Sequence, residues 1–134
     1  MRNDPGSEGR RWLAQAENDL AFAELAAREQ FFAQACFNSQ QAAEKALKAF
    51  LYARGAEQVF GHSVGELIAE CGKLDATFVQ LRQRAAPLDQ FYVSTRYPNS
   101  LPGGIPAEAF GPEDATRALG VAREVLAAVK RCLA

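Results

Sequence analysis

The spacing of apolar residues in this chain matches a helix over most of its length and a strand nowhere. In residues 9–28, apolar side chains recur every three or four positions, which places them on one side of a helix. This apolar stripe consists of Trp12, Ala16, Leu20, Ala23 and Ala27. No segment sustains the alternation of apolar and polar residues that marks a half-buried strand. The sequence therefore predicts an all-α fold.

Two further helices are marked by residues typical of helix ends. A long helix is predicted over residues 31–54, because Gly55 suits the left-handed conformation that closes a helix. A short helix is predicted after Ser63, which can form a capping box with Glu66, and is expected to end at Gly72.

Prolines divide the second half of the chain. Residues 77–95 are predicted to form a helical region that is broken near Pro87, because proline lacks a backbone donor and crowds the preceding turn. A loop rich in glycine and proline is expected over residues 98–111, and a last helix over residues 112–133. Residues 1–8 are expected to be flexible. Together these segments predict a single domain, an up-and-down bundle of about five helices, four long regions and one short.

The bulk composition narrows the classes of protein. A chain of 134 residues can bury a core without metals or disulfides, and its formal net charge of −1 argues against strong non-specific binding of nucleic acid. No stretch is long and apolar enough to span a membrane, and the first ten residues lack the apolar core of a signal peptide. Cys36, Cys71 and Cys132 have no CxxC spacing, so we expect buried free thiols, a cytoplasmic location, and no metal or cofactor.

One polar pattern lies within the second predicted helix. Gln41, Glu44 and Lys48 recur at spacings of three and four residues and therefore share a helix face. Two interpretations stay open. The three residues form a solvated face with one helical ion pair, or they lie beside the end of the fourth helical region and orient Arg96.

Arg96 and Tyr97 end that fourth region, in the stretch "STRYPNSLPGGIP", where Pro98 stops the helix. In one interpretation Arg96 is interior and pairs with Glu44 or Asp19, because a buried arginine needs a carboxylate. In the other, Arg96 binds phosphate, Tyr97 stacks on a base, and the uncharged loop that follows exposes backbone donors.

His62 is the only histidine in the chain and stands directly before the cap of the short helix. It is either structural or, together with Arg96, a catalytic candidate, since imidazole is the commonest general base in enzymes. A single histidine without a Cys/His cluster does not make a multi-histidine metal site. The chain also lacks a phosphate-binding GxxxxGK[ST] loop, a GxGxxG turn and a GxSxG elbow.

Five segments, in order, resemble the HEPN domain family (higher eukaryotes and prokaryotes nucleotide-binding). They are "RWLAQAENDLAFAELA", "FNSQQAAEKALKAFL", "GHSVGEL", "YVSTRYP" and "ATRALGVAREVLAAVK", and the resemblance as a whole extends over about residues 11–133. The resemblance implies an α-helical bundle that commonly dimerises. It also implies a small nucleotidyltransferase partner in a toxin–antitoxin-like pair. Many members are metal-independent ribonucleases that act through an arginine and, a few residues later, a histidine.

The nuclease motif carries over only in part. Arg96 matches its arginine, but the positions of the histidine are occupied by Leu101, Pro102 and Gly103. None of these can move a proton, so the chain resembles an "RYP" branch of the family rather than the nuclease branch. Only His62 can replace the missing histidine, provided that the fold brings it near Arg96. We expect binding without turnover.

Three functions remain under consideration. The first is a nucleotide- or RNA-phosphate-binding module that works with a nucleotidyltransferase, for which Tyr97 is a natural acceptor. The second is a ribonuclease that uses Arg96 and His62 in a rearranged site. The third is a structural interaction protein whose dimer is its function. A homodimer is also expected because the chain has more large apolar side chains than a small core needs. These are Trp12, Phe22, Phe31, Phe32, Phe37, Phe50, Tyr52, Phe78, Phe91 and Tyr92.

Overall fold

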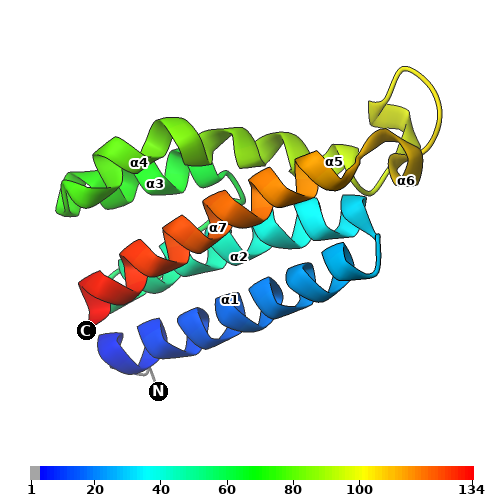
Figure 1. Cartoon of the computed structure of the whole chain (residues 1–134). Helices are drawn as coiled ribbons and strands as arrows, with labels where there is room; N and C mark the ends of the chain where they lie inside the picture. Colours follow the sequence, from blue (N-terminus) through cyan, green and yellow to red (C-terminus); the bar gives the residue numbers. More distant parts are fainter. Residues whose placement is uncertain (1–3) are drawn as a thin grey trace.

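The computed structural model describes residues 4–134, and every regular element in them is a helix (Figure 1). Helices α1 (Pro5–Arg28) and α2 (Phe32–Ala53) run antiparallel, and α7 (Pro112–Leu133) lies along α2. Helices α3 (Val64–Leu74) and α4 (Thr77–Ala85) form a second pair, on the side away from α1. The predicted all-α bundle is confirmed, and these five are the helices of nine or more residues in the described part of the chain.

Helix α1 begins four residues earlier than its apolar stripe predicts. The side chain of Asp4 accepts a hydrogen bond from the backbone N of Ser7 at 3.1 Å, and Pro5 occupies the first turn. An aspartate cap followed by proline is a favourable helix start. The expectation of a flexible segment over residues 1–8 is therefore wrong for residues 5–8, while residues 1–3 lie outside the described residues.

The ends of α2 and α3 agree with the sequence signals at two positions and differ at a third. Gly55 has φ +101°, which confirms the left-handed helix end, and Ser63 Oγ accepts from Glu66 N at 3.1 Å. Gly72, however, lies inside α3, which continues to Leu74. A Cβ at Gly72 would stand 3.2 Å from Val79 Cγ2, so this glycine allows α4 to approach α3 closely.

The predicted break at Pro87 is confirmed. Helix α4 is followed by a 3₁₀ turn η1 (Ala86–Gln90) and the short α5 (Phe91–Ser94). The glycine- and proline-rich segment is more ordered than expected, because it contains the 3₁₀ turn η2 (Pro98–Ser100) and the short helix α6 (Pro106–Ala109). Both begin with proline, whose fixed φ suits a first helical turn.

The core is built from small and large side chains in alternation. Alanines of α1, α2 and α7 lie fully or almost fully buried and allow these helices to pack closely, while Phe50 and Phe78 fill the space toward α4 with ring centroids 4.8 Å apart. Not all the large apolar side chains are inside, since Phe22 and Phe31 are exposed. No helix of the described residues combines the length and the hydropathy that crossing a bilayer requires.

Candidate functional site

Arg96 lies on the surface, directly after α5, and its side chain is surrounded by aromatic rings. Its guanidinium carbon is 4.5 Å from the ring centre of Phe37, 4.7 Å from that of Tyr92 and 5.2 Å from that of Tyr97. Its Nε donates to the backbone oxygen of Tyr92 at 2.8 Å. These cation–π contacts and the hydrogen bond hold the guanidinium in one place while leaving it accessible to solvent.

Of the two interpretations left open for Arg96, the pairing with Glu44 or Asp19 does not form. No carboxylate in the described part of the chain forms an ion pair with Arg96. Asp19 Oδ2 instead lies 2.8 Å from Lys45 Nζ, between α1 and α2. The physical reason is exposure, because a guanidinium that keeps its water needs no buried counter-ion.

Of the two interpretations of the polar face on α2, the solvated face is excluded, because Glu44 and Lys48 are only 3% and 6% exposed. Lys48 Nζ lies 3.2 Å from Glu44 Oε2 and 5.6 Å from the ring centre of Trp12, which comes from α1. Gln41 Nε2 donates to Glu44 Oε1 at 3.3 Å and to Gln40 Oε1 at 2.8 Å. This face of α2 therefore carries a row of buried polar groups that bond to one another.

His62 connects this buried row to the surface. Its Nδ1 lies 3.3 Å and 3.4 Å from the two carboxylate oxygens of Glu44, and its side chain is 59% exposed. A carboxylate only accepts hydrogen bonds, so this contact favours the proton on Nδ1 and leaves Nε2 as the acceptor. The backbone oxygen of His62 accepts from Gln40 Nε2 at 2.8 Å.

Tyr92 contacts both His62 and Arg96. The rings of His62 and Tyr92 are stacked, with centroids 5.0 Å apart and planes at 17°, and Arg96 lies over the same tyrosine. Gln41, Glu44 and Lys48 thus reach Arg96 only indirectly, through His62 and Tyr92. We refer to the whole group as the His62–Arg96 cluster. It consists of Phe37, Glu44, His62, Tyr92, Arg96 and Tyr97.

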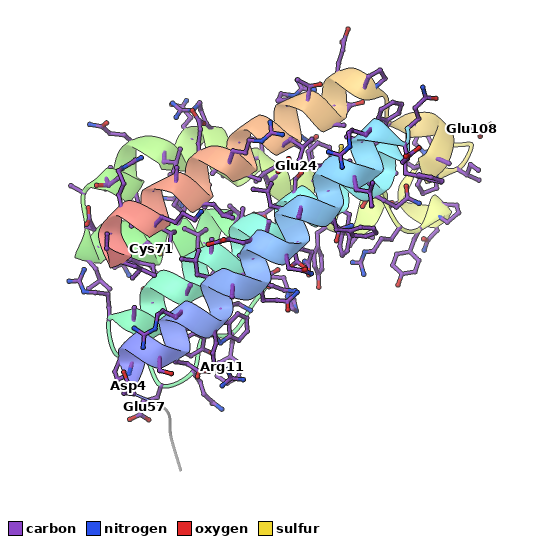
Figure 2. The ribbon with its side chains drawn as sticks, turned by 60° about the horizontal axis from the view of Figure 1, so that its bottom comes forward. Asp4, Arg11, Glu24, Glu57, Cys71 and Glu108 are labelled. Carbon is purple, nitrogen blue, oxygen red and sulfur yellow. The ribbon has the colours of Figure 1, made fainter. Side chains whose placement is uncertain are left out.

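Two members of the cluster were noted in the sequence only as large apolar side chains and not as candidate site residues, although both follow a regular spacing. Phe37 stands four residues before Gln41 and seven before Glu44, on the same face of α2. Tyr92 stands four residues before Arg96. The segment that follows the cluster includes α6 and lies at the end of the bundle away from the start of α1 (Figure 1). Figure 2 shows Glu108, in α6, at this end and Asp4 at the other.

The cysteines take no part in the cluster. Burial raises the pKa of the Cys36 and Cys71 thiols to about 12, so both are neutral and unreactive near neutral pH. Cys132 is only partly buried, and its Sγ lies 3.4 Å from Asp75 Oδ2; burial and then this carboxylate raise its pKa. No group of three or more His, Cys, Asp or Glu in residues 4–134 is arranged as metal ligands.

Comparison with known proteins identifies a family and several similar structures. The HEPN domain profile matches residues 10–132, whereas no curated protein matches the chain. The chain is similar to TT1696 from Thermus thermophilus, with 37% identity, a TM-score of 0.87, and coverage of 92% of this chain and 97% of that one.

Two further solved structures are similar over nearly their whole length. One is ST0689, an archaeal HEPN homologue, at 35% identity and a TM-score of 0.78, covering 95% of this chain and 98% of that one. The other is an HEPN domain protein from Thermotoga maritima, at 30% identity and a TM-score of 0.73, covering 92% of this chain and 97% of that one.

Proposed function

This chain belongs to the HEPN domain family, and we propose that it binds nucleotide or RNA phosphate at the His62–Arg96 cluster. One observation carries the proposal: Arg96 is a solvent-exposed cation, held by aromatic rings, with no ion pair to a carboxylate among residues 4–134. Guanidinium groups bind phosphate through two parallel hydrogen bonds, and aromatic faces stack on bases.

The candidate residues take different parts in this proposal. Arg96 contacts phosphate, and Tyr97, which is 51% exposed, stacks on a base. Glu44, Lys48 and Gln41 support His62 from the interior rather than touching ligand. Asp19, paired with Lys45, stays outside the set of ligand contacts.

A metal-independent ribonuclease is the second candidate function, favoured by the contacts that Glu44 and Tyr92 make with His62. In that reaction His62 Nε2 takes the proton of a 2′-hydroxyl, whose oxygen attacks the adjacent phosphorus. A 2′,3′-cyclic phosphate forms as the bond from phosphorus to the 5′-oxygen breaks, and this oxygen leaves with a proton supplied by water, while the protonated His62 later returns its proton to solvent. Arg96 stabilises the charge that develops on the phosphate oxygens.

Assembly forms a separate part of the proposal. The exposed Phe22 and Phe31 support a homodimer, and light scattering at micromolar concentration distinguishes it from a monomer. A small nucleotidyltransferase is proposed as the partner, with the exposed Tyr97 as the residue it modifies. If neither RNA nor nucleotide binds and only the dimer is found, a structural interaction protein remains.

Fluorescence anisotropy with a labelled single-stranded RNA of about twelve nucleotides tests the binding function. We expect Arg96→Ala to weaken binding about tenfold, since one charge-assisted contact is lost. Arg82→Ala removes an exposed arginine of α4 outside the cluster and is the matched control; its affinity should stay within about twofold. Equal losses in both variants would show non-specific attraction and contradict the proposal.

The same RNA, incubated with and without chelator, separates the two functions. Binding without cleavage above background supports the binding module. Cleavage that survives chelator and disappears in His62→Ala supports the ribonuclease. Cleavage that persists in His62→Ala belongs to a contaminant, because Glu44, the other proton acceptor of the cluster, is buried and paired with Lys48.

A further inference from the structure

Asp89 lies in η1, three residues before Tyr92 and seven before Arg96. Residues at these spacings share one face of a helical segment. The Asp89 carboxylate accepts three hydrogen bonds from the start of α3: from Ser63 Oγ at 2.8 Å, from Val64 N at 2.7 Å and from Gly65 N at 3.0 Å. A single carboxylate thus fastens the first turn of α3 to the segment that carries Tyr92 and Arg96.

The contact between these two segments is close because residue 65 is glycine. A Cβ at Gly65 would stand 3.2 Å from Ala86 Cβ and 3.5 Å from Asp89 Oδ2. A larger side chain would push the start of α3 away from η1. The chemistry of the docking is favourable as well, since backbone N–H groups at a helix N-terminus attract a negative charge.

His62 directly precedes the docked turn. Its backbone oxygen is held by Gln40, and the next residue, Ser63, is held by Asp89. On its other side stands Gly61, with φ +93°, where no heavy atom outside its chain neighbours would lie within 4 Å of an added Cβ. Asp89 therefore anchors the chain directly after His62, while Gln40 holds the His62 backbone oxygen and Glu44 contacts its ring.

We infer that Asp89 is a positioning residue, which holds His62 against Tyr92 and beside Arg96 and so sets the affinity of the cluster for RNA. The effect on RNA rests on the proposed function, whereas the effect on His62 does not. Asp89 acts through Ser63, Val64 and Gly65 and does not itself touch ligand. A residue that merely caps α3 would change stability and leave the His62 ring in place.

Asp75 provides a matched control. Its Oδ1 accepts a hydrogen bond from Thr77 N at 2.9 Å at the beginning of α4, away from the cluster. Asp75→Ala and Asp89→Ala therefore both remove an aspartate that accepts a hydrogen bond from the backbone at a helix start, one N–H for Asp75 and two for Asp89. Only Asp89→Ala releases the turn next to His62. Asp89→Asn, which keeps one acceptor oxygen, serves as a milder variant if Asp89→Ala does not fold.

The histidine ring signals in the proton NMR spectrum test the positioning directly, because His62 is the only histidine in the chain. In the wild type the stacked Tyr92 ring shifts these signals from their positions in an unstructured peptide. We expect Asp89→Ala to move them toward the peptide positions, Asp89→Asn to move them part of the way, and Asp75→Ala to leave them unchanged. Unchanged signals in folded Asp89→Ala or Asp89→Asn would overturn the inference.

The affinity for the labelled RNA tests the consequence. We expect Asp89→Ala to lose about as much affinity as His62→Ala, and the double variant to lose no more than either, because both changes remove one unit. Additive losses would overturn the inference, as would shifted His62 signals with unchanged RNA affinity while Arg96→Ala still weakens binding. If the wild type binds no RNA, the proposed function fails, and the NMR signals alone still decide whether Asp89 positions His62.

Discussion

Lys48 and Arg96 are both cations that lie over aromatic rings, but Lys48 is in the interior and Arg96 is on the surface. Lys48 is paired with Glu44, whereas Arg96 has aromatic neighbours and no carboxylate partner in the described residues. The difference follows from solvation. A buried charge must be neutralised within the protein, while an exposed one keeps its water and can exchange it for a ligand.

Removing the buried counter-ion is expected to have the largest effect. Glu44→Ala leaves Lys48 unpaired in the interior, and we expect the free energy of unfolding to fall by roughly 3–5 kcal/mol in urea denaturation. Glu70→Ala, which removes the partner of the exposed Lys73, is the control and should cost less than about 1 kcal/mol. If Glu44→Ala lost less than about 1 kcal/mol as well, Lys48 would have access to water, and its contrast with the exposed Arg96 would be contradicted.

Removing the surface cation is expected to change binding rather than stability. Arg96→Ala should weaken RNA binding about tenfold, equivalent to about 1.4 kcal/mol, while the free energy of unfolding changes by less than about 1 kcal/mol. Urea denaturation and anisotropy on the same sample measure both. A large destabilisation with unchanged affinity would contradict this expectation. Arg96 would then have a structural role, as Lys48 does.

The cysteine thiols also differ in burial, and this difference predicts how stability and thiol reactivity depend on pH. Because burial raises the pKa of Cys36 and Cys71 to about 12 from the ordinary 9.0, their stabilising contribution is present below pH 9 and is lost as pH rises toward 12. At pH 8, a thiol reagent should therefore modify the partly buried Cys132 first and the other two only on unfolding. Simultaneous modification of all three in the folded protein would contradict the burial of Cys36 and Cys71.

The smallest effect on stability is expected from removing an ion pair that is exposed to solvent. Arg84 makes two hydrogen bonds of 3.1 Å to Glu124, and both side chains are open to solvent. Glu124→Gln should cost less than about 1 kcal/mol of unfolding free energy, and the difference should disappear in about 1 M salt. A cost like that of Glu44→Ala would show that pairing, rather than burial, sets the energy.

Much of the fold follows from the sequence because its signals are local. Apolar spacing marks the helices, Gly55 closes α2, and Pro87 divides α4 from α5. The prediction fails where a residue type has two structural roles, as glycine does at helix ends and at close helix contacts. Gly72 serves close packing against Val79 rather than a helix end, and this depends on how α4 returns along α3.

From the sequence, only the residue types of the site and their spacing along the chain could be predicted. The sequence identified three candidate binding or catalytic residues, Arg96, Tyr97 and His62. It also showed that Gln41, Glu44 and Lys48 share one face of a helix. Spacing cannot tell whether that face is covered, because Trp12 of α1 and His62 of a later connection provide the cover. Tertiary structure alone decided that Glu44 holds His62 and that Arg96 has no carboxylate partner within residues 4–134. Local helical order is encoded by neighbours in the chain, whereas burial and pairing arise between residues that meet only when the helices pack.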